Sequence, residues 1–302
     1  MAAANERHLP QRVIIDTDIG TDIDDAYALL LAISSPELVV RGVTLVHGDL
    51  HTRAGIALKL LRLAGREDVP VIPGESRPMN PDRPIYWQGH EGRGLDFSDI
   101  EFPKGQSAVQ FIVSRAAPDT ILVPIGPMTN VGLAIRDHPN EMARYKGIVA
   151  MASTFNGFGP ENAGTEHNIA LDPEAAEIVL DSGIPTVLVG LNVTMQTSLT
   201  RRMVEMISAA RTPLARFMSL MTEDWFSVVG RDATNMHDPL AAAITFAPDL
   251  VETVPVTAKV DMAKAGLITY EAYEDSPVGI CTSLDADRFQ QLFLSRILEV
   301  VG

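Results

Sequence analysis

The stretch IIDTDIGTDIDDAYALL, residues 14 to 30, joins an apolar run to a helical pattern through five aspartates. The run that leads into Asp16 is short and β-branched, as in a buried strand. After the aspartates, apolar residues recur with the 3.6-residue period of a helix. Carboxylates this close together repel and raise each other's pKa unless a cation or a row of backbone N–H groups holds them. The stretch therefore predicts a first βα unit whose turn is either a solvated acidic loop or a metal site.

The rest of the chain repeats this alternation of strand and helix. Short β-branched runs are followed by segments of helical period, which is the pattern of βα units around a mostly parallel sheet. We therefore expect an α/β fold with an open, mostly parallel sheet flanked by helices. After a first strand at residues 12–16, further strands are predicted at residues 39–48, 69–73, 120–126, 146–152 and 185–190.

The part of the chain beyond these strands is less regular. Residues 73–103 contain many Gly and Pro and predict a long loop over a site. No shift in composition marks a linker, so we expect a single domain over residues 1–302. For the C-terminal part, the sequence predicts helices near residues 201–211 and after Pro213, antiparallel strands at 252–261 and 266–273, and an amphipathic helix at the end.

Composition restricts the class of protein and its partners. An apolar fraction of 46% over 302 residues is enough for a sizeable core. The formal net charge of −15 argues against a nucleic-acid partner, which needs clustered Lys and Arg. The longest apolar stretch, residues 26–33, is too short to span a membrane. With Cys281 as the only cysteine, no disulfide can form within the chain. We expect a cytoplasmic protein that binds a small molecule, a cation or both.

Several known acidic motifs can be compared with this cluster. An EF-hand that began at Asp16 would need a glutamate at its twelfth position, where Tyr27 stands. The D-x-D-x-T/V motif of haloacid dehalogenase-type phosphatases fits Asp16 and Asp18, but Gly20 replaces the final Thr or Val. That class stays open as an alternative. A helix N-terminus would account for one or two of the aspartates, but not for five.

The aspartate stretch resembles the N-terminal signature of the nucleoside hydrolases, the inosine–uridine-preferring N-ribohydrolase family. Further segments resemble those of the family and follow in its order, over roughly the first four-fifths of the chain, which makes the resemblance specific. These segments are LVPIGPMTNV (122–131), VAMASTF (149–155), ENAGTEHNIALDPEAA (161–176) and MHDPLA (236–241).

The resemblance implies an enzyme that hydrolyses the N-glycosidic bond of a ribonucleoside in a Ca²⁺-dependent reaction, giving ribose and a free nucleobase. It implies that Asp18, Asp25 and Asp238 bind Ca²⁺ through their carboxylates and that Ile125 binds it through its main-chain carbonyl. It also implies a homodimer or a homotetramer. For the chemistry, Asp24 is the candidate general base that activates water, and His237 is the candidate acid for the leaving base.

Other residues are candidates for binding the substrate. Asn162, Glu166 and Asn168 look like a clamp for the ribose hydroxyls, because amides and a carboxylate supply the required donors and acceptors. Asp49 could accept a hydrogen bond from the sugar, and Met151 could lie beneath it. Trp87 could stack on the nucleobase. Weaker candidates for the base pocket are His90, Phe155, Phe158, His167, Trp225 and Phe226.

The spacing of the aspartates departs from the family. The family has three residues between the first metal-binding aspartate and the Asp-Asp pair, whereas residues 19–23 make five here. Alignment at the pair makes Asp24 the base and Asp25 a ligand, which we prefer because the following helix start matches. Alignment from Asp18 would instead place Asp22 in the catalytic position. Under the preferred alignment, Asp22 is a neighbour of the site or an extra ligand, and Asp16 braces the strand end.

Two other functions remain alternatives to nucleoside hydrolysis. One is a ribose- or nucleoside-binding protein that keeps the pocket and performs no chemistry. The other is the phosphatase, in which Asp16 would be the nucleophile. The sequence does not distinguish purine from pyrimidine substrates, because the segments that would contact the base resemble the family least.

Overall fold

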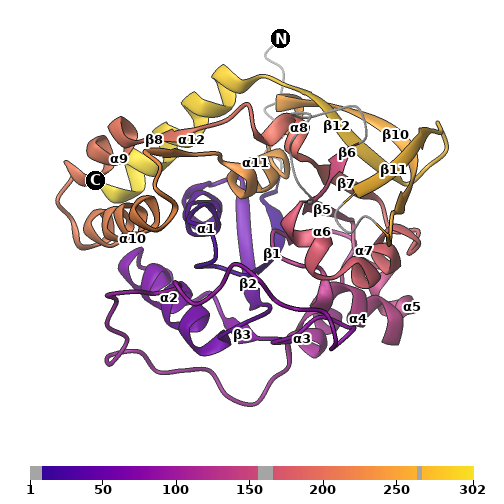
Figure 1. Cartoon of the computed structure of the whole chain (residues 1–302), viewed down its shortest axis with the longest axis horizontal. Helices are drawn as coiled ribbons and strands as arrows, with labels where there is room; N and C mark the ends of the chain where they lie inside the picture. The colour runs from indigo at the N-terminus through magenta and orange to yellow at the C-terminus, as the bar shows by residue number, and fades with distance from the viewer. Residues whose placement is uncertain (1–8, 156–165, 264–266) are drawn as a thin grey trace, which may run out of the picture.

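The computed structural model describes residues 9–155, 166–263 and 267–302. Their main feature is a ten-stranded sheet in the order β3-β2-β1-β4-β5-β7-β12-β10-β11-β6, with a small separate sheet of β8 (Leu199–Thr200) and β9 (Ala233–Thr234). Helices surround the large sheet (Figure 1). The expected α/β fold with an open, mostly parallel sheet is therefore confirmed.

The first six strands in this order are parallel to one another, so their carboxyl ends meet at one edge. Their order changes direction at β1, since the chain runs outward to β2 and β3 and then returns to β4 on the other side. Such a switch point is where open α/β sheets bind ligands. The strands are β1 (Gln11–Thr17), β2 (Leu38–Leu45), β3 (Val71–Pro73), β4 (Thr120–Pro124), β5 (Gly147–Met151) and β7 (Thr186–Val189).

Alternate residues of these strands enter two hydrophobic cores. Val13 and Ile15 of β1 belong to one core and Ile14 to the other, as the two-residue period of a strand requires. One core includes residues of α1 (Asp24–Ser34), α2 (Leu50–Leu63), α9 (Arg201–Ser208), α10 (Pro213–Val229), α11 (His237–Ile244) and α12 (Ala286–Val301). The other includes residues of α3 (Ala108–Ser114), α4 (Thr129–Asp137), α5 (Pro139–Met142), α6 (His167–Leu171) and α7 (Pro173–Leu180).

The C-terminal part is more regular than the sequence indicates. The predicted antiparallel pair is present as β10 (Val251–Val260) and β11 (Leu267–Ala272). A strand that the sequence did not predict, β12 (Val278–Leu284), pairs with β7 and with β10 and so joins this pair to the parallel part of the sheet. The short β6 (Thr154–Phe155) completes the edge beside β11.

The predicted long loop is also present, as residues 74–107 contain neither helix nor strand. We call residues 74–107 the long loop. It lies against α2, where the ring of Phe97 approaches Gly55 so closely that a Cβ atom there would be 2.7 Å from it. Among the described residues, no helix has the length and apolar character that crossing a membrane requires.

Candidate active site

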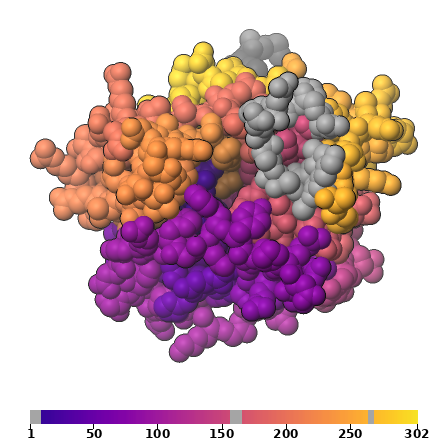
Figure 2. Space-filling model, viewed as in Figure 1, coloured from indigo at the N-terminus to yellow at the C-terminus, as the bar shows by residue number. Residues whose placement is uncertain are grey.

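A cavity of about 280 Å³ opens at the carboxyl ends of the parallel strands. Asp18 follows β1, Ile125 follows β4, Met151 ends β5 and Leu191 follows β7, and all four line the cavity. Figure 2 shows a hollow on this face between the purple segment and the orange segment. The other residues that line it are Thr21, Asp22, Asp24, Asp25, Trp87, Glu166, His167, Asn168, His237 and Asp238.

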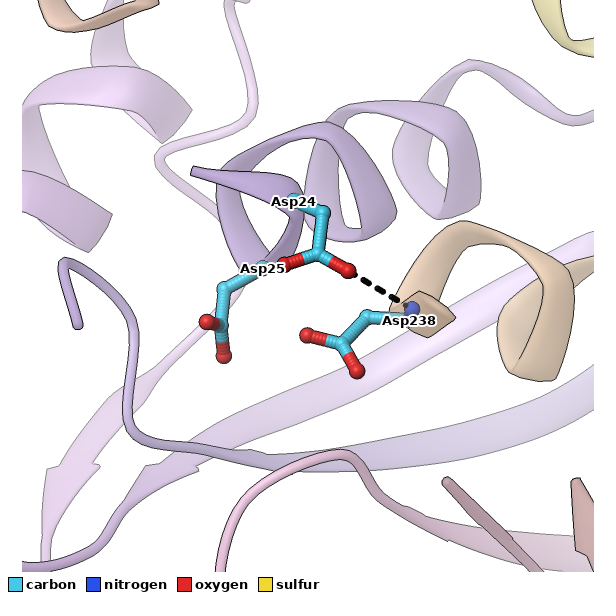
Figure 3. Close-up of side chains that lie close together, drawn as sticks. All are labelled: Asp24, Asp25 and Asp238. Carbon is cyan, nitrogen blue, oxygen red and sulfur yellow. Dashed lines mark hydrogen bonds between the residues drawn. The ribbon is translucent and has the colours of Figure 1, made fainter. Parts of the chain in front are cut away.

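Three buried carboxylates form the acidic centre of this cavity. Asp24 and Asp25 begin α1, Asp238 lies in the first turn of α11, and one oxygen of each lies within 4.8 Å of the others (Figure 3). We call these three residues the acidic triad. The two helices pack against each other, which brings together residues far apart in the chain. Both helix N-termini offset part of the repulsion between the carboxylates.

The acidic triad has the donors that a hard cation requires. Burial, together with the charge of neighbouring aspartates, raises the pKa of Asp24, Asp25 and Asp238 well above the usual range. Buried carboxylates of this kind are stabilised by a cation that shares their oxygens. Ile125 also lines this cavity, and its main-chain carbonyl, which accepts a hydrogen bond from Asn168, is the candidate for a further oxygen. These residues therefore fit an ion such as Ca²⁺.

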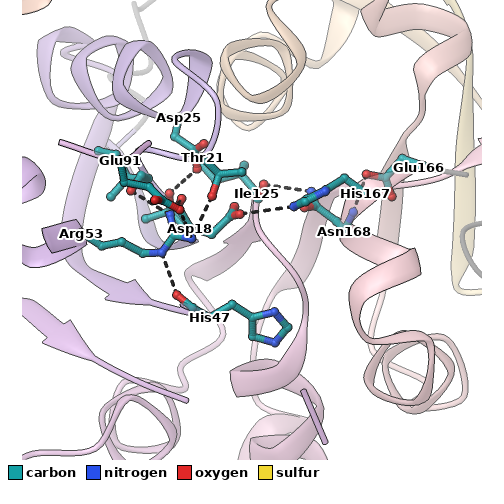
Figure 4. A network of polar contacts seen from close by, with 12 residues as sticks. Asp18, Thr21, Asp25, His47, Arg53, Glu91, Ile125, Glu166, His167 and Asn168 are labelled. Carbon is teal, nitrogen blue, oxygen red and sulfur yellow. Dashed lines mark hydrogen bonds and ion pairs between the residues drawn. The ribbon is translucent and has the colours of Figure 1, made fainter. Parts of the chain in front are cut away.

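Asp18, a predicted metal ligand, is not a member of the acidic triad. Its Oδ2 atom lies 3.7 Å from Nε2 of His167 (Figure 4). Burial alone would raise the pKa of Asp18, but the contact with His167 and the charge of Arg53 hold it below the usual value. Asp24, the predicted general base, is in the triad instead. Asp18 is thus outside the group of three, although its charge still contributes to the raised pKa of Asp25 and Asp238.

Two members of the predicted ribose clamp, Glu166 and Asn168, also line the cavity. Asn168 donates two hydrogen bonds from Nδ2, to the carbonyl of Ile125 at 2.9 Å and to that of Met151 at 3.0 Å. Glu166 caps α6 and accepts hydrogen bonds from three main-chain N–H groups, those of Ser153, Asn168 and Ile169. Both side chains are held in place beside the cavity. Asn162, the third member of the clamp, is outside the described residues.

Asp22 and Asp16 differ in their relation to the cavity. Asp22 lines it and accepts a hydrogen bond from the N–H of Ile23 at 2.6 Å. Asp16 is 0% exposed and accepts hydrogen bonds from Thr44 on β2 at 2.5 Å and from Asn130 on α4 at 2.8 Å. A side chain buried in this way joins the strand to its neighbours and is inaccessible to a substrate, which disfavours the phosphatase.

Asp49 was expected to contact the sugar, and its position does not support that prediction. It is the N-cap of α2, where its carboxylate accepts hydrogen bonds from the N–H groups of His51 and Thr52 and from the Thr52 hydroxyl. It is exposed and is not among the residues that line the cavity. A capping role satisfies the same acceptor oxygens that a sugar hydroxyl would use.

His237 and Trp87 line the cavity, as expected for residues near the leaving base. The Nδ1 atom of His237 lies 2.7 Å from the hydroxyl of Thr194, and burial lowers the pKa of His237 to about 4. This imidazole is therefore neutral at pH 7. Trp87 is 46% exposed and meets the ring of His90 edge-on, with ring centroids 5.3 Å apart.

The sequence did not indicate that Thr21 and Leu191 line the cavity, and it indicated His167 only as a minor candidate for the base pocket. The position of His167 between Glu166 and Asn168, in a segment that resembles the family, was a usable signal for it. Thr21 lies in the lengthened loop, and Leu191 follows a strand whose end carries no polar motif. No sequence pattern distinguished these two residues.

Comparisons with known proteins point to one family. The family model described as inosine-uridine preferring nucleoside hydrolase matches residues 13–291. The probable uridine nucleosidase 2 of Arabidopsis thaliana is 30% identical over 96% of this chain and 98% of its own. A pyrimidine-specific ribonucleoside hydrolase, RihA of Photobacterium profundum, is 31% identical over 94% of this chain and 98% of its own.

Solved structures give the same result. A purine-preferring ribonucleoside hydrolase from Gardnerella vaginalis has a TM-score of 0.84 and 29% identity, over 96% of this chain and 99% of that one. A plant nucleoside hydrolase has a TM-score of 0.86 and 26% identity, over 96% of this chain and 99% of that one. The similarity thus covers nearly the whole chain.

Proposed function

Because the chain belongs to the inosine-uridine preferring nucleoside hydrolase family and is a nucleoside hydrolase, we propose that it cleaves ribonucleosides to ribose and a free nucleobase in a Ca²⁺-dependent reaction. The observation that carries this proposal is the cavity, which the acidic triad lines together with Glu166 and Asn168, the side chains proposed to bind the sugar. We also propose that residues 1–302 form one domain. The homodimer or homotetramer and the cytoplasmic location stay predictions from the sequence.

The proposed Ca²⁺ ligands are the carboxylates of the acidic triad and the main-chain carbonyl of Ile125. Four hard oxygen donors of this kind leave positions for a water molecule and for ribose hydroxyls, since Ca²⁺ takes six to eight oxygens. When bound, the ion would lower the pKa of that water and help to fix the sugar. This set differs from the sequence prediction, because Asp24 takes the place of Asp18.

We propose that Asp18 is the general base, in place of Asp24, which the sequence predicts for this role. Asp24 has its Oδ2 atom occupied by the N–H of Asp238, at 3.1 Å, and contributes an oxygen to the triad. Asp18 lines the same cavity, lies outside the triad and has His167 beside it. A carboxylate that lies beside the proposed ion and does not share its oxygens with it is free to accept a proton from water.

The remaining side chains bind the two halves of the substrate. Asn168 and Glu166 are proposed to bind ribose hydroxyls, with Met151 against the apolar face of the sugar. The reaction develops positive charge on the sugar ring, which the surrounding carboxylates stabilise. Neutral His237 has an N–H group that can donate a hydrogen bond to the departing base. Trp87 is proposed to stack on that base.

The experiment is a base-release assay on a panel of purine and pyrimidine ribonucleosides, with Ca²⁺ and with a chelator. We expect release of a free base that depends on Ca²⁺, and a loss of release in the Asp25→Asn variant. The panel is needed because the relatives are named for uridine, pyrimidine and purine substrates. Ribonucleoside binding without base release would favour the binding protein, and release of phosphate alone would favour the phosphatase.

A further inference from the structure

Arg53 is a buried cation whose charge acts on Asp18 and Asp25, and no step proposed above uses it. It lies on α2, and its side chain is only 2% exposed. A buried guanidinium is costly unless hydrogen bonds and an opposite charge compensate it. The contacts of Arg53 therefore indicate what it holds in place.

The first set of contacts is with the turn that follows β1. One terminal nitrogen, Nη1, donates to the main-chain carbonyls of Asp18 and Ile19, and the other, Nη2, donates to the hydroxyl of Thr21 at 2.8 Å (Figure 4). Asp18 and Thr21 both line the cavity. Arg53 thus fixes the backbone that carries the proposed base. Its Nε atom donates to the carbonyl of His47 at 2.7 Å, which anchors the guanidinium itself.

The second contact is with the long loop. Nη2 of Arg53 lies 3.6 Å from Oε1 of Glu91, whose side chain is 6% exposed. Within the described part of the chain, this Glu91 oxygen has no hydrogen-bond partner, so the ion pair with Arg53 is what compensates it. The other oxygen, Oε2, accepts a hydrogen bond from Gly89 at 2.6 Å. Glu91 therefore fastens the segment next to Trp87 to α2.

A third contact joins the long loop and the turn directly. Nε2 of His90 lies 2.7 Å from the carbonyl of Thr21. Gly20, in the same turn, has a φ of +105°, and a Cβ atom there would lie 3.3 Å from Glu91 and 2.7 Å from Ile56. The turn and the long loop are thus in close contact around Arg53.

We propose that Arg53 is a positioning residue that sets the place of Asp18 and, through Glu91, ties the Trp87 segment of the long loop to the same turn. The inference rests on the proposed function, because it assigns Asp18 and Trp87 their roles there. A lysine could not replace the arginine, since its single ammonium cannot reach all these acceptors in the fixed planar geometry of a guanidinium.

The test compares Arg53→Met and Arg53→Lys with a matched control, Arg62→Met. Arg62 lies on the same helix and also binds the long loop, through Asp99 at 2.9 Å, but its side chain is 37% exposed. Among the described residues, its ion pairs are with Asp99 and Glu67, neither of which belongs to the turn. The measurements are kcat, KM, the Ca²⁺ dissociation constant and hydrogen exchange of peptides that cover residues 18–25 and 86–95.

We expect both Arg53 variants to lose about 10- to 100-fold in kcat, as when a group that orients an active-site residue is removed. Hydrogen exchange in both peptides should be faster in the Arg53 variants than in wild type. Arg62→Met should have the kcat of wild type and the same hydrogen exchange in both peptides. Glu91→Gln, which keeps the length of the side chain and removes its charge, should raise KM more than it lowers kcat and should increase exchange in residues 86–95.

The outcomes separate this inference from the proposed function. If wild-type protein releases no base, the proposed function fails, and the exchange data still test the positioning role. The inference is overturned if Arg53→Lys folds and shows wild-type kcat and wild-type exchange in residues 18–25. If Arg53→Met does not fold, Arg53→Lys and Glu91→Gln carry the test. The inference is also overturned if Glu91→Gln and Arg62→Met have equal effects on KM and on hydrogen exchange.

Discussion

The Oδ2 atom of Asp24 accepts a hydrogen bond from the main-chain N–H of Asp238, at 3.1 Å. This bond joins the first turns of α1 and α11, which are 214 residues apart in the chain at this point. The N-cap residue of α11, Met236, has no side chain that can cap the helix, so Asp24 satisfies one of its free N–H groups. Asp24 therefore helps to cap α11, whereas the carboxylate of Asp18 contacts His167. This difference is the basis for the exchange of their proposed roles.

The exchange is tested with Asp18→Asn and Asp24→Asn. We expect Asp18→Asn to lower kcat by about 10²- to 10⁴-fold even at saturating Ca²⁺, because an amide cannot accept a proton from water. Asp24→Asn should raise the Ca²⁺ dissociation constant, and added Ca²⁺ should restore part of its activity. Calorimetric titration with Ca²⁺ and steady-state kinetics measure both quantities. If high Ca²⁺ rescues Asp18→Asn and not Asp24→Asn, the original assignment of Asp24 as the base is correct.

His47 makes stability depend on pH. It is 0% exposed, its Nε2 atom lies 2.7 Å from the Thr129 hydroxyl, and burial lowers its pKa from 6.5 to about 4. Between these values the unfolded state binds more protons than the folded state, so stability rises with pH. Above pH 6.5, His47 is neutral in both the folded and the unfolded state and does not lower the free energy of unfolding. As the pH falls toward 4, the unfolded state gains the proton first, so the free energy of unfolding decreases. The full shift of the His47 pKa corresponds to about 3 kcal/mol in the free energy of unfolding.

The variant that isolates this effect is His47→Asn. The backbone of His47 has a φ of 57°, and asparagine tolerates this left-handed conformation better than most residues do. We expect the free energy of unfolding of the variant to fall less than that of wild type when the pH is lowered from 7 to 4.5, in urea titrations with chelator present. Parallel pH dependences of the two proteins would show that His47 does not titrate in this window.

Local sequence patterns predicted most of the sheet, and the resemblance to the nucleoside hydrolases gave most of the residues that line the cavity. The burial of Val13, Ile14 and Ile15 on two faces follows from their β-branched character, and the strand ends bring Ile125 and Met151 to one cavity. The strands could be predicted because neighbouring residues along the chain decide them, and the geometry of parallel strands gives the edge at which the cavity lies. The choice of Ile125 and Met151 at that edge came from the resemblance.

Features that depend on distant contacts were not predicted. Asp18 and Asp24 differ only through partners on other elements, His167 for one and Asp238 for the other. Asp49 could be read as a sugar ligand or as a helix cap, and only the position of α2 distinguishes these roles. The strand β12 contains Gly279, which weakens its periodic pattern, and it is stabilised by pairing with β7 and β10.

His237 is predicted to act as a neutral donor to the leaving base. Its lowered pKa, near 4, leaves it uncharged from pH 6 to 8, so the loss of activity in His237→Ala should be the same across this range. We expect kcat to fall by about 10²- to 10⁴-fold. A pH–rate profile of wild type and variant measures this. A limb near pH 6.5 that is present in wild type and absent in His237→Ala would show that the histidine acts as a charged acid.

Trp87 is predicted to contribute to substrate binding through stacking on the nucleobase. It lines the cavity, is 46% exposed, and has a φ of 59°, which holds the ring on a strained segment of the long loop. Stacking of a base on an aromatic ring contributes about 1–3 kcal/mol, so Trp87→Ala should raise KM by about tenfold or more. Trp87→Phe keeps an aromatic face and should retain most of the affinity.

Leu9 is a suitable control for this prediction, because it is the most exposed of the large apolar side chains described, at 91%, and does not line the cavity. Leu9→Ala should leave KM unchanged. The substrates of the panel add a second comparison, since a purine has the larger ring system and should lose more affinity than a pyrimidine when Trp87 is replaced by alanine. Equal KM values for wild type and Trp87→Ala on every ribonucleoside that is cleaved would show that the ring packs against the loop and does not contact the base.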